Sequence, residues 1–258
     1  MRAEPPSPPH VASTLAFPLD LTTPHGRLRA TLPLPDRPLR LSEVVPLLLQ
    51  IDTQIVGQAL RRAADDGHAT TCGPGCGACC RQLAAVSVPE AFAITATLTG
   101  LAPDHRLRVQ ARFAGAAATL DQHPELLARL QTPAADDAVA TARDYFDLQF
   151  ACPFLEEESC SIHRDRPSIC REINVSSPPA LCREPFTNAV AGIRSPLRLS
   201  EVLARAHAHL YERPAPRLLP LSLAPRWVAD HPDLDHLAWP AEPLLRDLVA
   251  AMQRGMAA

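Results

Sequence analysis

Four of the chain's eight cysteines lie within nine residues, and this cluster constrains the fold more than any other feature. The stretch reads Cys72-Gly-Pro-Gly-Cys76-Gly-Ala-Cys79-Cys80. Thiolates are soft ligands that bind zinc, iron and iron–sulfur clusters. Glycines let the loop adopt left-handed backbone conformations, and the proline limits its freedom before folding. The stretch therefore predicts a tight metal-binding loop.

The other four cysteines form a second block about seventy residues later, with wider spacings. Those spacings favour a loop-rich wrap over a single zinc knuckle. We expect the two blocks to converge on one metal centre. The predicted ligands are Cys72, Cys76, Cys79, Cys80, Cys152, Cys160, Cys170 and Cys182.

Two positions leave more than one interpretation open. Neighbouring side chains diverge, so Cys79 and Cys80 either serve different ions or divide between a ligand and a packing residue. Cys182 lies farthest from the tight spacing and also fits a buried, inert cysteine. Disulfides are the other use of clustered cysteines, but they are typical of short secreted chains. The proline-rich start of this chain lacks the apolar segment of a signal peptide, so we expect reduced cysteines and a cytoplasmic protein.

Arginines accompany the cysteines. Arg81, Arg171 and Arg183 each follow a cysteine directly, and Arg164 and Arg166 lie between Cys160 and Cys170. Because a thiolate centre carries negative charge, such arginines are expected to donate hydrogen bonds to sulfur or to neutralise it. The alternative is abundance alone, since every basic residue apart from histidine is an arginine.

The combined motifs Cys-x3-Cys-Gly-x-Cys-Cys-Arg, Cys-Pro-Phe-Leu, Cys-Ser-Ile-His and Arg-Pro-x-x-Cys-Arg resemble the YkgJ-type cysteine-cluster family, which is associated with zinc or iron chelation. The resemblance runs from about residue 72 to 182. It implies that every cysteine of both blocks except Cys182 occupies a family position. His163 falls where relatives often have tyrosine, so a packing role is expected for it. Flagellin lysine N-methylases have a similar cluster, associated with an iron–sulfur cluster.

Two functions follow from this pattern. The first is a metal-binding protein that holds zinc or iron, with a [4Fe-4S] cluster as one form of that iron. The second is an iron–sulfur-dependent enzyme, either redox or methyl- or alkyl-modifying. All-cysteine zinc sites are usually structural, because catalysis needs an open coordination position. No catalytic Ser-His-Asp or paired-carboxylate spacing is evident, and Glu156 to Glu158 are expected to form a solvated loop tip.

Charge and hydropathy exclude other classes. The formal net charge is -3, and no long basic run exists, which argues against a nucleic-acid partner. No apolar stretch approaches the ~20 residues of a membrane-spanning helix. We therefore predict a metal ion or cluster as the partner, without nucleic acid or membrane.

The remaining pattern predicts a mainly α fold: an irregular helical bundle around a loop-rich cysteine metal site, with a small N-terminal β-hairpin. Alternation around Pro24-His25-Gly26 favours the hairpin. Residues 1–13 are expected to be a disordered tail, and 14–258 a single compact domain with the metal-binding core at 72–182. Helices are expected over 42–67, 87–100, 103–120, 124–130, 136–150, 200–212, 219–230 and 240–254.

Individual residues within these helices also carry expectations. Ser87 and Glu90 match a capping box. Asp52 interrupts an apolar stripe and is expected at its edge. Val139, Tyr145 and Phe146 are expected to face the core. His207 and His209 are expected to be exposed or to cap the helix.

Overall fold

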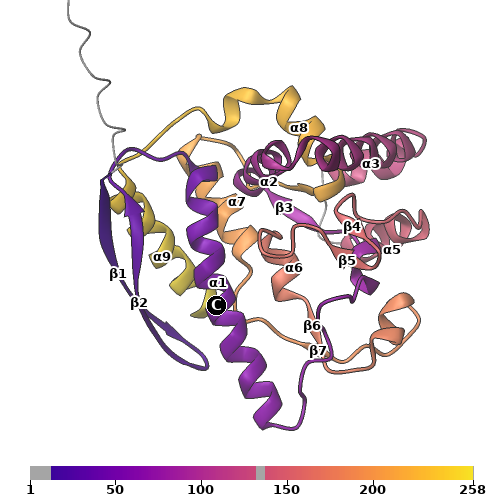
Figure 1. Cartoon of the computed structure of the whole chain (residues 1–258), viewed down its shortest axis with the longest axis horizontal. Coiled ribbons are helices and arrows are strands. Elements are labelled where there is room, and N and C mark those ends of the chain that lie inside the picture. The colour runs from indigo at the N-terminus through magenta and orange to yellow at the C-terminus, as the bar shows by residue number, and fades with distance from the viewer. Residues whose placement is uncertain (1–12, 132–136, 258) are drawn as a thin grey trace, which may run out of the picture.

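The computed structural model describes residues 13–131 and 137–257, and it is mainly helical (Figure 1). The predicted tail therefore lies, apart from Ser13, outside the described residues. The mainly α class is confirmed. The helices are α1 (Leu41–Asp65), α2 (Val88–Gly100), α3 (Pro103–Asp121), α4 (Pro124–Gln131), α5 (Ala138–Asp147), α6 (Ser168–Glu172), α7 (Leu199–Leu210), α8 (Ala224–Asp230) and α9 (Ala241–Ala257).

The predicted hairpin is present at the start of the described chain. Strand β1 (Thr14–Thr23) pairs antiparallel with β2 (Gly26–Pro35), and Thr23 lies opposite Gly26 across the turn. Alternate side chains of β1 are buried, because successive residues of a strand point to opposite faces. One face of the hairpin is therefore apolar and must be covered by helices.

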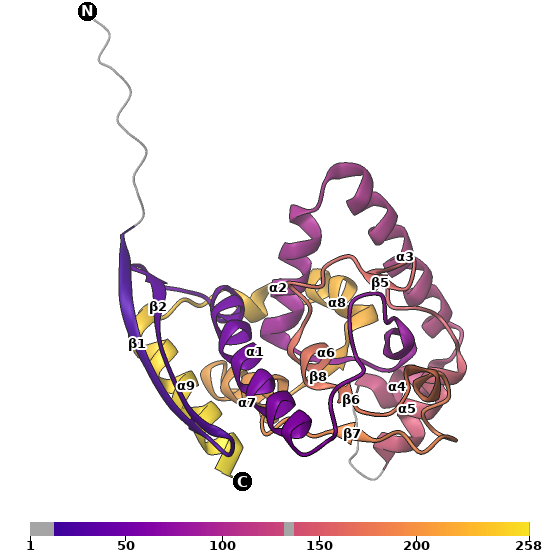
Figure 2. The ribbon, with the colours of Figure 1, turned by 60° about the horizontal axis from the view of Figure 1, so that its bottom comes forward.

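Three helices cover that face. Leucines and valines of α1, α7 and α9 form one core with the buried residues of the hairpin. Figure 2 shows the hairpin at one edge of the molecule, with α9 against it and α3 to α5 on the far side. Gln253 of α9 fixes this contact, because its amide accepts from the Thr22 backbone N–H at 2.9 Å and donates to the Thr22 carbonyl at 2.7 Å. Segments separated by 231 positions in the sequence thus lie side by side.

A second core lies beneath the cysteine segment. Helices α2 and α3 pack there against Phe154 and Ile162 of the second cysteine block, and Leu219, Leu221 and Ala224 complete it from later in the chain. Phe113 and Phe154 meet edge to face, with ring centroids 5.2 Å apart. A third, smaller cluster joins α3, α4 and α5.

The short strands explain one wrong helix boundary. Strand β3 (Ala85–Ser87) pairs with β8 (Leu218–Pro220), so the helix expected from Leu219 begins only at Ala224. Local periodicity cannot reveal a partner strand more than a hundred residues away. The other pairs are β4 (Leu155–Glu156) with β5 (Ser159–Cys160), and β6 (Asn174–Val175) with β7 (Gly192–Ile193).

Three residue-level expectations are also wrong. Asp52 is completely buried rather than at the edge of its stripe, because α1 is covered on more than one side by α2 and α6. His207 is buried, stacks on Tyr211 and lies 2.9 Å from the Leu234 carbonyl through Nε2. Val139 is 68% exposed, whereas its expected partners Tyr145 and Phe146 are buried.

Candidate metal centre

The first cysteine loop begins shortly after α1 ends, and it is tied to β6, the strand between Cys170 and Cys182. The Thr71 backbone N–H donates to the Val175 carbonyl at 2.9 Å, and its hydroxyl donates to the Ser177 carbonyl at 2.6 Å. The Val175 N–H in turn donates to Cys72 Sγ at 3.4 Å. The loop can turn because Gly75 adopts a φ of 81°, which other residues reach only with strain. Cys72 is thereby held against β6.

The second block approaches the same loop through a hairpin. Strands β4 and β5 pair around Glu157 and Glu158, and both glutamates have positive φ. The Cys152 N–H donates to the Cys80 carbonyl at 2.7 Å. Arg81 pairs with Glu158 at 2.7 Å. These contacts join the two cysteine blocks directly.

The close approach of loop and hairpin requires a glycine at position 77. A Cβ built there would lie 2.8 Å from Leu155 Cδ1, 2.8 Å from Glu158 Oε2 and 3.1 Å from the Glu158 Cα. The two side-chain distances are too short for real contacts, and the distance to the backbone Cα is tighter than most. Gly77 is therefore a position at which the loop packs tightly against the hairpin.

Six of the predicted ligands surround one cavity of about 90 Å³, which is the space of a few water molecules. They come from both blocks: Cys76, Cys79, Cys80, Cys152, Cys160 and Cys170. The other two predicted ligands, Cys72 and Cys182, do not line it. Cys182 is buried on the 3-10 turn Pro179–Arg183, close enough to Cys72 and Cys76 for their charges to raise its pKa beyond the effect of burial. All eight cysteines have free thiols.

The thiols perturb each other's ionisation. The interaction between the Cys79 and Cys80 side chains lowers the pKa of Cys79 and raises the pKa of Cys80. Burial raises the pKa of Cys152 to about 12. Burial, followed by the charges of its thiol neighbours, also raises the pKa of Cys170. Several thiols at this site therefore resist ionisation until a positive charge offsets the cost.

Arg166 supplies part of that charge. It lines the cysteine cavity, and its Nε is buried without a hydrogen-bond partner among the described residues. Its charge adds to the lowering of the Cys79 pKa and opposes the rise in the pKa values of Cys160 and Cys170, which burial causes. An unsatisfied N–H beside thiols fits a donor to metal-bound thiolate sulfur.

The other expected arginines have different contacts. Arg171 donates to Thr53 Oγ1 at 2.8 Å and to the Arg166 carbonyl at 2.8 Å. Arg81 binds Glu158, and Arg183 lies near that same carboxylate, whose pKa it helps to lower. Arg164 is exposed and faces away from the cysteine cavity. Position next to a cysteine was therefore a poor guide to contact with its sulfur.

The acidic run forms the tip of the β4–β5 hairpin, where Glu157 and Glu158 are exposed as expected, but two of its carboxylates also make ion pairs. Glu156 binds Arg112 at 2.6 Å and lies 3.3 Å from His105 Nε2, and Glu158 binds Arg81. These pairs fasten the hairpin to α3 on one side and to the first cysteine loop on the other.

A contact that the sequence did not reveal positions Cys170. Glu90 forms the expected capping box with Ser87 and, with its other oxygen, accepts from the backbone N–H of Ser168 at 2.9 Å and from its hydroxyl at 2.7 Å. Glu172 accepts from the Leu199 N–H at 2.8 Å. The short helix that carries Cys170 is thus anchored by a buried carboxylate at each end. Only the Ser-x-x-Glu capping pattern gave any signal for it.

The thiols are gathered but are not in a coordination arrangement. Within residues 13–131 and 137–257, no group of three or more Cys, His, Asp or Glu side chains is placed to hold one metal ion. His163 lines the cavity but is largely exposed. Partial loss of hydration, followed by the charge of the nearby Arg166, lowers its pKa.

Comparison with protein families identifies this part of the chain. Residues 71–188 match the family model CxxCxxCC, described as a "putative zinc- or iron-chelating domain". This segment resembles a CxxCxxCC domain. It contains all eight cysteines and agrees with the family suspected from the motifs. No curated protein and no solved structure matches the chain.

The CxxCxxCC domain supports a zinc or iron partner for this protein. It occupies less than half of the chain, and the hairpin, all of α1 and helices α7 to α9 lie outside it. In the described ranges, no helix is long and apolar enough to cross a membrane.

Proposed function

We propose that this protein holds zinc or iron through thiolates drawn from both cysteine blocks. The observation that carries the proposal is that cysteines from both blocks surround one small cavity. The proposed ligands are Cys72, Cys76, Cys79, Cys80, Cys152, Cys160, Cys170 and Cys182. A bound metal would supply the positive charge that lets buried thiols ionise.

The cysteine side chains around the cavity fit a zinc or iron centre. Thiols with raised pKa values favour the protonated state when no cation is near, and Arg166 offers an unsatisfied N–H toward them. A cavity of about 90 Å³ suits an ion or a small cluster better than an organic substrate. Because the thiols are not yet in a coordination arrangement, loading would rotate side chains and tighten the loop.

The number of thiols favours a centre with more than one metal atom as a second candidate. A zinc ion takes four ligands, whereas six cysteines surround this cavity. A [4Fe-4S] cluster also takes four cysteines but occupies more space than one ion. Catalysis at such a cluster is the alternative function, and it would require a substrate to reach the cluster.

Elemental analysis combined with a visible spectrum on protein purified without oxygen tests the proposal. Zinc gives stoichiometric metal without colour, and an iron–sulfur cluster gives iron, sulfide and broad visible absorbance. Fresh protein with neither zinc nor iron would overturn the proposal.

Variants identify the ligands. Cys76→Ser and Cys79→Ser are each expected to lose metal and to lower the free energy of unfolding, because metal binding and folding are coupled. His163→Phe is the control on the same cavity and is expected to keep its metal content. Unchanged metal in both cysteine variants would contradict the ligand assignment.

We also propose that residues 14–258 fold as one unit around the centre at 72–182. Reduced thiols require a reducing compartment, which favours the cytoplasm. A single cooperative transition in urea, monitored by two probes, would support folding of residues 14–258 as one unit.

A further inference from the structure

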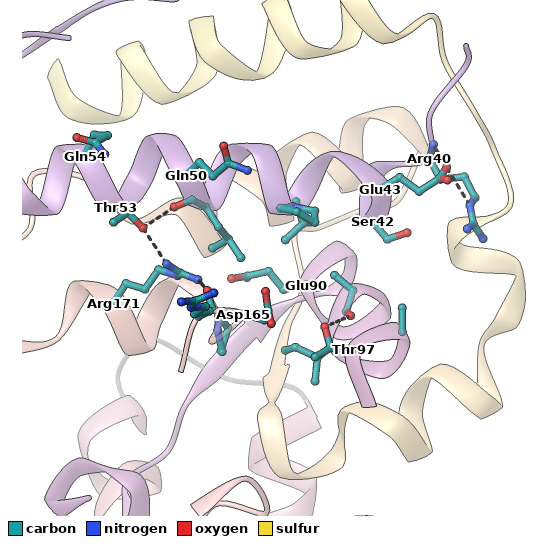
Figure 3. Close-up of a pocket in the computed structure, with 18 residues that line it drawn as sticks. Arg40, Ser42, Glu43, Gln50, Thr53, Gln54, Glu90, Thr97, Asp165 and Arg171 are labelled. Carbon is teal, nitrogen blue, oxygen red and sulfur yellow. Dashed lines mark hydrogen bonds and ion pairs between the residues drawn. The ribbon is translucent and has the colours of Figure 1, made fainter. Parts of the chain in front are cut away.

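A second, larger cavity lies outside the cysteine site. It measures about 590 Å³, within the usual range of small-molecule pockets. Its walls are α1, α2 and the segment 164–171, as Figure 3 shows. No cysteine lines it, but Pro167 lines both cavities, so the two sites share one wall.

The floor of this second cavity is apolar. Val45 and Leu49 of α1 face Ala93, Ile94 and Ala96 of α2 across it. A ligand that fills this space therefore needs an apolar portion.

Many of the polar groups around the cavity are already satisfied within the protein. Glu43 accepts from Arg37 at 2.9 Å and from the Arg40 backbone N–H at 2.9 Å. Glu90 accepts four hydrogen bonds from Ser87 and Ser168. These groups shape the walls.

Arg171 is partly satisfied in the same way. Its guanidinium reaches Thr53, as Figure 3 shows, and also donates to the backbone carbonyls of Arg164 and Arg166. It stiffens the wall that the two cavities share.

Four lining side chains are exposed to solvent and available to a ligand. Arg164 and Asp165 form no side-chain hydrogen bond or ion pair with the described residues, and neither do Gln50 and Gln54. Arg164 and Asp165 are consecutive, so one free cation and one free anion lie on the same wall. A purely anionic ligand would be repelled by Asp165 and Glu90, and a purely cationic one by Arg164 and Arg171.

We propose that this cavity binds a zwitterion with an apolar side chain, of the kind that a free amino acid or a short peptide provides. Arg164 binds the carboxylate, and Asp165 binds the ammonium group. The apolar side chain lies on the floor between α1 and α2. Gln50 and Gln54 are available for the amide groups of a peptide.

The test is calorimetric titration of the protein as purified, with four probes. Leucine and leucyl-leucine carry both charges, while N-acetyl-leucyl-leucine and leucyl-leucine amide each lack one. We expect one of the first two to bind with a Kd of about 1 mM or tighter. Blocking either end is expected to weaken binding about tenfold, the loss of one charge-assisted hydrogen bond. The comparison of leucine with the dipeptide distinguishes the two sources of the zwitterion.

Two variants assign the charges. Arg164→Gln is expected to weaken the free dipeptide about tenfold but leave the amide-blocked form unchanged. Asp165→Asn is expected to weaken binding of the free dipeptide about tenfold and to leave binding of the acetylated dipeptide unchanged. Arg129→Gln is the matched control, because Arg129 pairs with Asp144 and does not line this cavity.

Absence of binding at millimolar concentration, or equal binding of blocked and free peptides, would overturn the proposal. Metal content is measured on the same samples. Peptide binding without metal would sink only the metal-site proposal, and metal without peptide binding would sink only this one.

Discussion

At the scale of single residues, Asp52 is the least expected group in the molecule. It is fully buried, and neither carboxylate oxygen has a hydrogen-bond partner in the part of the chain that the structure describes. Burial, and next the charge of Glu172, raise its pKa to about 8, while Arg171 opposes the rise. A neutral Asp52 is therefore the form that the fold tolerates.

This raised pKa predicts how stability depends on pH. The unfolded chain ionises Asp52 near pH 4, whereas the folded protein keeps it protonated up to about pH 8. Because of Asp52, the free energy of unfolding therefore falls as pH rises between those values, by at most about 1.4 kcal/mol per pH unit. Glu172, with a pKa raised to about 7, acts in the same direction.

The variant Asp52→Asn isolates this contribution. As pH rises from 5 to 8, the difference in unfolding free energy between this variant and the wild type is expected to grow by about 4 kcal/mol in favour of the variant, by the same linkage. Urea unfolding at both pH values, at matched metal content, measures the difference. Parallel pH dependences of the two proteins would show that Asp52 is ionised in the fold.

At the scale of elements, the structure depends on contacts between segments that are each short. The β4–β5 hairpin, the first cysteine loop and α6 have few internal contacts, and they hold one another through Arg81, Glu158, Glu90 and Ser168. Gly77 lies where the loop packs tightly against the hairpin.

Gly77→Ala is expected to separate the two cysteine blocks. The added methyl group clashes with Leu155 and Glu158, and overpacking of this kind costs about 1–3 kcal/mol. We expect lower stability together with faster metal loss to a chelator. Gly73→Ala in the same loop is the control, since nothing lies within 4 Å of its Cβ and its φ is not left-handed. Equal metal loss in the two variants would contradict this role for Gly77.

The same distinction between local and distant contacts decides what sequence could predict. Helices α1 and α2 follow from apolar periodicity and from the Ser87–Glu90 capping box, which are local signals. The cysteine clusters predicted the location of the site for the same reason. The burial of Asp52, the pairing of β3 with β8 and the second role of Glu90 depend on distant segments. The spacing of residues along the chain does not indicate those long-range contacts.

At the scale of the whole molecule, the CxxCxxCC domain shares its core with residues beyond it. Leu219, Leu221 and Ala224 complete the apolar cluster beneath Phe154, and β8 supplies the partner of β3. The segment 71–188 contains Phe154 and β3 but lacks Leu219, Leu221, Ala224 and β8.

A fragment spanning 71–188 is therefore expected not to fold on its own. Far-ultraviolet circular dichroism during urea titration should show no cooperative transition, in contrast to the full chain. A fragment that includes residues up to 230 restores β8 and α8, and it is expected to recover part of the transition. Cooperative unfolding of the shorter fragment would show that the domain is autonomous.

The bond between Thr22 and Gln253 bears on synthesis at the ribosome. Domains begin to fold as the N-terminal part emerges, at about 5–20 residues per second. The hairpin is among the first segments made, but its apolar face lacks one of its covering helices until α9 has left the exit tunnel. For several seconds a nascent chain therefore displays all eight cysteines while its first core still lacks one covering helix.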